Sequence, residues 1–204
     1  MILFITACSN EINNINDENN MDVNQSETKE DTFVRASEVV ISKKDNMTVE
    51  SFYADKELID IAMKYIGKDY GDLKYLDYEG NEYQLSDIDK PIILMYTSPY
   101  CGACIMTIET MNQAKEKYPE YEVISMMDRR DLNAYNIYKE KGHKGDLYYM
   151  ADDEDLKKAE FNSQGIPFLI FMDENKEIRL VHLGSLELDM MMDGLVHFAF
   201  KAER

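Results

Sequence analysis

Basic side chains are scarce in this sequence. It has 22 Lys and Arg against 40 Asp and Glu in 204 residues, which gives a formal net charge of -18. Binding to a nucleic-acid backbone needs patches of Lys and Arg, so no nucleic-acid partner is expected. A bare anionic lipid surface would also repel this charge. The acidic balance indicates a solvated surface and identifies no substrate.

Long apolar runs and cysteines are also few. No apolar run approaches the ~18–20 residues that a transmembrane helix requires, so no transmembrane helix is expected. The three cysteines are Cys8, Cys101 and Cys104, too few for a scaffold held together by disulfides. Their odd number leaves one thiol to explain, and Cys8 lies far from the other two in the sequence.

The pair Cys101 and Cys104 has the spacing CxxC, which occurs in metal sites, haem attachment sites and redox dithiols. A structural zinc or iron–sulfur site needs further ligands in a tight cluster. The histidines are widely scattered, at His143, His182 and His197. Haem attachment needs a histidine directly after the second cysteine, where this chain has Ile105. No metal is expected, and no cofactor other than the cysteine pair itself.

The spacing of apolar residues predicts alternating helices and strands. A nearly continuous apolar run at 91–96 is typical of a strand buried on both faces, and the CxxC follows it. Helical spacing then continues from about Cys101 to Lys117. The other predicted helices are 55–66, 131–141, 153–161 and 188–201, and the other predicted strands are 73–78, 82–85, 121–126, 146–150, 168–172 and 177–183. This order predicts an α/β fold with a mixed central sheet flanked by helices.

A cysteine pair at the start of a helix suits thiol–disulfide exchange. The thiolate is the nucleophile, and the unpaired N–H groups and dipole of a helix start stabilise negative charge. We therefore assign Cys101 as the nucleophile that forms a mixed disulfide. Cys104 is the resolving thiol, which attacks Cys101 and releases the product. A static disulfide is the alternative, although so short a loop would contribute little entropic stability.

The segment Tyr96-Thr97-Ser98-Pro99-Tyr100-Cys101-Gly102-Ala103-Cys104, followed later by Gly165-Ile166-Pro167 and an apolar strand, resembles the thioredoxin superfamily. The resemblance implies a thioredoxin-like fold in which Pro167 is cis and shapes the site beside the CxxC. It also implies that the backbone of Ile166 pairs with an extended substrate. The residues expected to line the substrate site are Tyr100, Gly102, Ala103 and Ile166.

The predicted N-terminal hairpin at 73–85 and the central insertion at about 131–162 resemble the exported TlpA/ResA-like branch. Members of that branch are commonly membrane-anchored thiol–disulfide oxidoreductases that face outward. They are often reductive and are recharged by a membrane electron-transfer protein. The expected partners are therefore protein disulfides or thiols and such an electron carrier. A reductase and an oxidase use the same residues, so the direction of electron flow stays open.

At some positions this sequence carries a different residue from the one that is common in these families. Tyr100 stands where tryptophan is common before the first cysteine, and the dipeptide 102–103 stands where an X-Pro pair is frequent. Met95 and Thr107 stand where thioredoxin and some branch members have an acidic side chain. We therefore assign no general base. The alternative functions are a thiol peroxidase and a non-catalytic thioredoxin-like binding module.

The chain begins with a short apolar run that ends in Ile5-Thr6-Ala7-Cys8. This resembles the end of a bacterial lipoprotein signal peptide, which implies lipidation of Cys8 and a place outside the cytoplasm, anchored to a membrane. The run is shorter than the ~7–15 residues usual in a signal and no basic residue precedes it, as in a truncated signal. A free cysteine after a chance apolar stretch is the alternative. Residues 9–50 predict an acidic, largely disordered tether, and 51–204 the thioredoxin-like domain.

Overall fold

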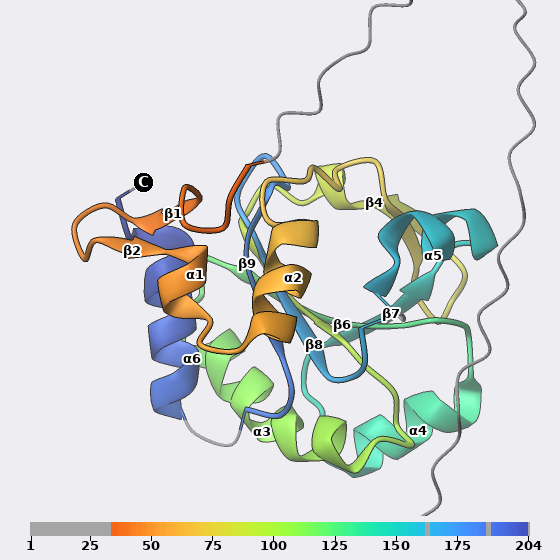
Figure 1. Cartoon of the computed structure of the whole chain (residues 1–204). Coiled ribbons are helices and arrows are strands. Elements are labelled where there is room, and N and C mark those ends of the chain that lie inside the picture. The colour runs from red at the N-terminus through yellow and green to blue at the C-terminus, as the bar shows by residue number, and fades with distance from the viewer. Residues whose placement is uncertain (1–33, 162–163, 187–188, 204) are drawn as a thin grey trace, which may run out of the picture. The chain divides into compact units, whose positions relative to one another are not determined.

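The computed structural model describes residues 34–161, 164–186 and 189–203 (Figure 1). The predicted signal at 1–8 with its lipidation site Cys8, and the tether up to residue 33, lie outside the described residues. Residues from Val34 onward form one unit by their contacts. In this described part, no helix is both long and apolar enough to cross a membrane.

The central sheet has seven strands in the order β4-β3-β7-β6-β5-β8-β9. The strands are β3 (Lys74–Leu76), β4 (Glu82–Gln84), β5 (Ile92–Tyr96), β6 (Glu122–Met127), β7 (Asp146–Met150), β8 (Phe168–Met172) and β9 (Ile178–Leu183). Strand β5 is parallel to β6 and antiparallel to β8. All residues of β5 are buried, as its apolar run predicts. The mixed sheet confirms the predicted fold class.

Helices flank this sheet (Figure 1). They are α2 (Lys56–Tyr65), α3 (Gly102–Lys117), α4 (Leu132–Glu140), α5 (Asp153–Ala159) and α6 (Asp189–Val196), which continues into a π-helical turn (His197–Lys201). Asp55, Asp131 and Asp152 stand before α2, α4 and α5, and each accepts two backbone N–H groups of the first turn. Gly67 and Gly142 follow α2 and α4 with a φ of 86°, a conformation that suits glycine and ends a helix.

A hairpin and a short helix precede α2. Strand β1 (Val40–Ser42) pairs antiparallel with β2 (Met47–Thr48), and α1 (Val49–Phe52) follows. Ile41 is fully buried, and the Lys43 N–H donates to the Glu203 carbonyl at 2.7 Å. The prediction of a largely disordered tether over residues 9–50 did not include these elements, which begin at Val40. Strands this short leave almost no alternation of polar and apolar residues to detect.

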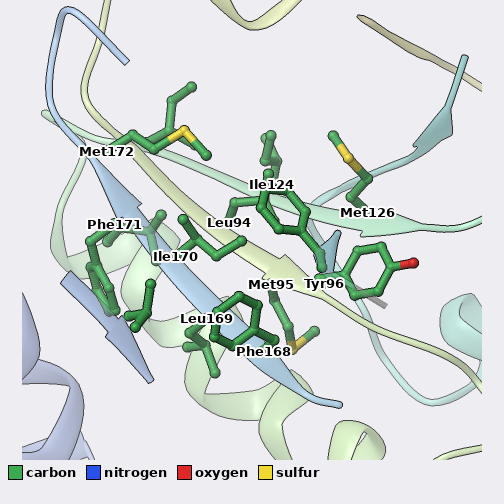
Figure 2. Packing of buried hydrophobic residues seen from close by; sticks show 14 of the residues in the cluster. Leu94, Met95, Tyr96, Ile124, Met126, Phe168, Leu169, Ile170, Phe171 and Met172 are labelled. Carbon is green, nitrogen blue, oxygen red and sulfur yellow. The ribbon is translucent and has the colours of Figure 1, made fainter. Parts of the chain in front are cut away.

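The core around β5, β6 and β8 is shown in Figure 2, where Leu94, Ile124 and Ile170 pack among their apolar neighbours. Strands β5 and β8 are buried along their whole length, which explains why their sequences are continuous apolar runs rather than alternating ones. This packing fixes the end of β5, from which the CxxC loop starts.

Candidate active site at the start of α3

The loop between β5 and α3 carries the CxxC. The Thr97 N–H donates to the Met126 carbonyl at 2.9 Å, which extends the pairing of β5 with β6. The Cys101 N–H donates to the Ser98 carbonyl at 3.2 Å and closes a turn. Cys101 is the N-cap of α3, and its sulfur accepts the Cys104 N–H at 3.2 Å. The pair therefore stands at the start of a helix that follows a buried strand.

The two cysteines differ in burial. Both are free thiols, with Cys101 partly exposed and Cys104 fully buried. Burial first, and the neighbouring Cys101 thiol second, raise the pKa of the Cys104 thiol to about 12. Cys104 is therefore held as a neutral thiol behind Cys101. This asymmetry suits an exposed attacking group and a buried resolving group.

The segment 165–167 lies against the cysteine pair. The Ile166–Pro167 peptide bond is cis, the isomer that the resemblance implies. The Cys101 thiol donates to the Ile166 carbonyl at 3.5 Å. Pro167 is buried and Ile166 is half-buried. Residues far apart in the sequence thus meet around the Cys101 sulfur.

The other residues expected to line the substrate site surround Cys101 on the surface. Tyr100 is 69% exposed, and its hydroxyl donates to Asp131 Oδ2 at 3.1 Å. Gly102 is exposed, and a Cβ added there would meet no atom within 4 Å. Ala103 is half-buried on the first turn of α3. Asp131 was not expected in the site, although the sequence marked it as the start of a helix.

A cavity of about 350 Å³ lies beside the site, and its walls come from the CxxC loop, the Gly165–Ile166 segment and the chain before α4. Pro99, Met127 and Ile166 form an apolar part of the wall. Burial raises the pKa of Asp128. The pKa of Asp131 is lowered because its carboxylate accepts the Ala134 N–H and the Tyr100 hydroxyl. The cavity can take an apolar group of a substrate, and its wall also carries the charged residues Asp128, Arg129 and Asp131.

Two hydroxyl groups that sequence reasoning missed lie behind Cys104. Thr97 is 3% exposed and Tyr138, on α4, is fully buried. Thr97 Oγ1 and the Tyr138 hydroxyl hydrogen-bond to each other. The Ser98 backbone and the Thr97 side chain both lower the pKa of the Cys104 thiol, against the larger effect of burial. Ala134 and Tyr138 are four residues apart, a spacing that places both on one buried face of α4. The sequence does not say which residues that face contacts.

The positions that lack an acidic side chain are filled by packing. Met95 is fully buried within β5. The Thr107 hydroxyl donates to the Ala103 carbonyl at 2.9 Å and accepts the Leu186 N–H at 3.2 Å. Both residues thus serve the structure around α3. Within the described residues, no group of three or more His, Cys, Asp or Glu side chains could hold a metal ion.

Solved structures share this fold, although no family model and no curated protein matches the sequence. The chain is similar to a candidate electron transfer protein from Aquifex aeolicus VF5, with a TM-score of 0.57 and 20% identity over 68% of this chain and 96% of that one. A candidate thiol:disulfide interchange protein DsbE from Chlorobium tepidum has a TM-score of 0.55 and 18% sequence identity, over 65% of this chain and 97% of that one. A secreted Mycobacterium tuberculosis disulfide oxidoreductase homologous to E. coli DsbE has a TM-score of 0.52 and 16% sequence identity, over 61% of this chain and 94% of that one. The chain therefore has the thioredoxin-like fold.

Proposed function

We propose that this protein is a thiol–disulfide oxidoreductase that exchanges disulfides with protein substrates through Cys101 and Cys104. The observation that carries the proposal is the position of the Cys101 sulfur. It caps α3, 3.2 Å from the Cys104 N–H nitrogen, and lies 3.5 Å from the Ile166 carbonyl oxygen. A partly exposed nucleophile thus stands at a helix start, beside backbone that can pair with an extended chain. The likeness of the fold to DsbE-like oxidoreductases adds support.

The reduction proceeds in two exchanges. The Cys101 thiolate attacks one sulfur of the substrate disulfide, and the other substrate sulfur leaves with the bonding electrons and takes up a proton. Cys104 then attacks Cys101, and the second substrate sulfur leaves in the same way. Two electrons have passed from the cysteine pair to the substrate, and the pair ends as a disulfide. Oxidation of a substrate dithiol is the reverse.

Reduction of insulin tests the proposal. We expect the wild-type chain with a reductant to precipitate insulin faster than the reductant alone, and Cys101→Ser to lose that acceleration because the nucleophile is gone. The matched control is Cys8→Ser, which removes the third cysteine and should keep full activity. Equal acceleration by Cys101→Ser and the wild type would contradict the proposal. Peroxide consumption without activity on insulin would favour the peroxidase.

We further propose that the protein acts outside the cytoplasm, held to a membrane by a lipid on Cys8 and recharged by a membrane electron-transfer protein. The residues Ile5–Cys8 and the secreted nature of the similar M. tuberculosis protein support this. The direction of electron flow follows from the midpoint potential of the cysteine pair. A value near about -270 mV indicates a reductant, and one near about -120 mV an oxidant.

A further inference from the structure

The cavity beside the CxxC loop is lined by a residue whose buried hydroxyl group makes no hydrogen bond. Tyr96, at the end of β5, belongs to the wall of the cavity and is 1% exposed. Figure 2 shows its hydroxyl pointing away from Leu94 and the apolar cluster. Among the described residues this hydroxyl has no hydrogen-bond partner. Buried polar groups are nearly always hydrogen-bonded, so the Tyr96 hydroxyl marks a place where a polar group of a ligand can bind.

The cavity lies close to the position that a substrate cysteine takes. Its wall contains Tyr100, which directly precedes Cys101, and Ile166, whose carbonyl oxygen lies 3.5 Å from the Cys101 sulfur. Its volume of about 350 Å³ falls within the ~300–1,000 Å³ that is typical of ligand pockets. Consecutive Cα atoms of a chain are only ~3.8 Å apart. A residue next to a substrate cysteine bonded to Cys101 can therefore place its side chain in the cavity.

The charged residues of the cavity wall favour a positively charged group. They are Asp128, Arg129 and Asp131. The Arg129 guanidinium already has an anionic partner, because it lies 3.4 Å from Asp153 Oδ1. The Asp131 carboxylate accepts the Ala134 N–H at 3.1 Å, which favours its ionised form. The wall therefore carries two carboxylates and one guanidinium that is paired elsewhere, so it attracts a cation and repels an anion.

We propose that this cavity selects protein substrates with a lysine or arginine next to the reacting cysteine, and that Tyr96 determines this specificity. The aliphatic part of such a side chain packs on the apolar part of the wall. Its charged end donates a hydrogen bond to the Tyr96 hydroxyl, and the carboxylates of Asp128 and Asp131 balance its charge. A wholly apolar side chain would leave the Tyr96 hydroxyl unpaired, and an acidic one would be repelled. The inference rests on the proposed function and names the class of substrate that the site prefers.

Matched peptide disulfides test this selection. Three short peptides carry lysine, norleucine or glutamate on both sides of a single cysteine, and each is oxidised to its symmetric disulfide. The rate constant for reduction by the reduced full-length chain is measured for each peptide. It is divided by the rate constant of the same peptide with dithiothreitol, which removes differences in intrinsic reactivity. We expect the lysine peptide to be reduced about tenfold faster than the norleucine peptide, and the glutamate peptide to be the slowest.

Variants separate the cavity from the general attraction of an acidic protein for basic peptides. Tyr96→Phe removes only the hydroxyl and should lower the lysine-to-norleucine ratio by about tenfold, because a hydrogen bond to a charged group is lost. The rate with the norleucine peptide should stay within about twofold. Asp128→Asn, at an exposed position, should lower the ratio by about two- to fivefold. Tyr121→Phe and Glu120→Gln remove a hydroxyl and a charge outside the cavity wall, and both should keep the wild-type ratio.

The outcomes distinguish this proposal from the proposed function. An unchanged ratio in both Tyr96→Phe and Asp128→Asn, or an equal fall in all four variants, would overturn the selection by the cavity. Reduction of the lysine and norleucine peptides by the wild type at one common rate would also overturn it, and would leave the proposed function standing. If the wild type reduced none of the peptides, the proposed function would be contradicted and the selectivity with it.

Discussion

At the scale of the residue, the two cysteine side chains have the same chemistry and different surroundings. Cys101 lies partly exposed with its sulfur among backbone groups, whereas Cys104 is fully buried. Burial opposes the ionised form of a thiol, so Cys104 is held in its neutral form while Cys101 is open to substrate. The division of roles within a CxxC therefore depends on contacts that the four-residue motif does not contain.

A buried histidine gives the fold a pH dependence of its own. His143 is 5% exposed, its Nε2 lies 2.9 Å from the Ser125 hydroxyl, and burial lowers its pKa to about 4. Above about pH 6.5 the ring is neutral in both the folded and the unfolded chain. Between about pH 6.5 and about pH 4 only the unfolded chain binds the proton, so stability falls as the pH falls. We expect His143 to lower the free energy of unfolding by up to about 3 kcal/mol as the pH falls through that window.

Urea unfolding at a series of pH values measures this cost. Carboxylates titrate in the same range, so the quantity to compare is the difference between the wild type and His143→Gln, which cannot be protonated. The variant should lose less unfolding free energy than the wild type as the pH is lowered. Parallel losses in the two proteins would show that His143 does not contribute.

At the scale of the element, the β1–β2 hairpin is the part of the described fold that was least expected. Ile41 on β1 is fully buried. Ile41→Ala should lower the free energy of unfolding by about 2–5 kcal/mol, because it removes buried methyl groups and leaves a cavity. Val34→Ala, at a position 48% exposed, is the control and should change it by less than about 0.5 kcal/mol. Urea unfolding followed by circular dichroism gives both values, and equal stability of the two variants would contradict a packed hairpin.

The longer elements could be predicted because their signals are local. Asp131 and Gly142 mark the two ends of α4, and the apolar run of β5 marks a strand covered on both faces. The CxxC and the segment before Pro167 could be identified for the same reason. Contacts across the fold carry no such signal. Nothing in the sequence around Tyr138 says that its hydroxyl meets Thr97, because that contact depends on how α4 packs on the end of the sheet.

At the scale of the whole molecule, charge and anchoring are linked. A chain with a net charge of -18 is repelled by an anionic membrane surface, so a place at the membrane requires an attachment that overcomes this repulsion. A lipid on Cys8 would supply it through burial of its acyl chains.

Mass spectrometry of the chain isolated from its native membrane tests this anchor. We expect the mature N-terminus to be Cys8 carrying a lipid mass, and the protein to enter the detergent phase on phase separation. Cys8→Ser should move the protein to the aqueous fraction, because without the thiol no lipid can be attached, while its insulin reduction stays equal to that of the wild type. Recovery of a peptide that still contains the residues before Cys8, or of an unmodified Cys8, would contradict the anchor. Since Cys101 and Cys104 remain intact in Cys8→Ser, that result would leave the proposed chemistry standing and change only where it takes place.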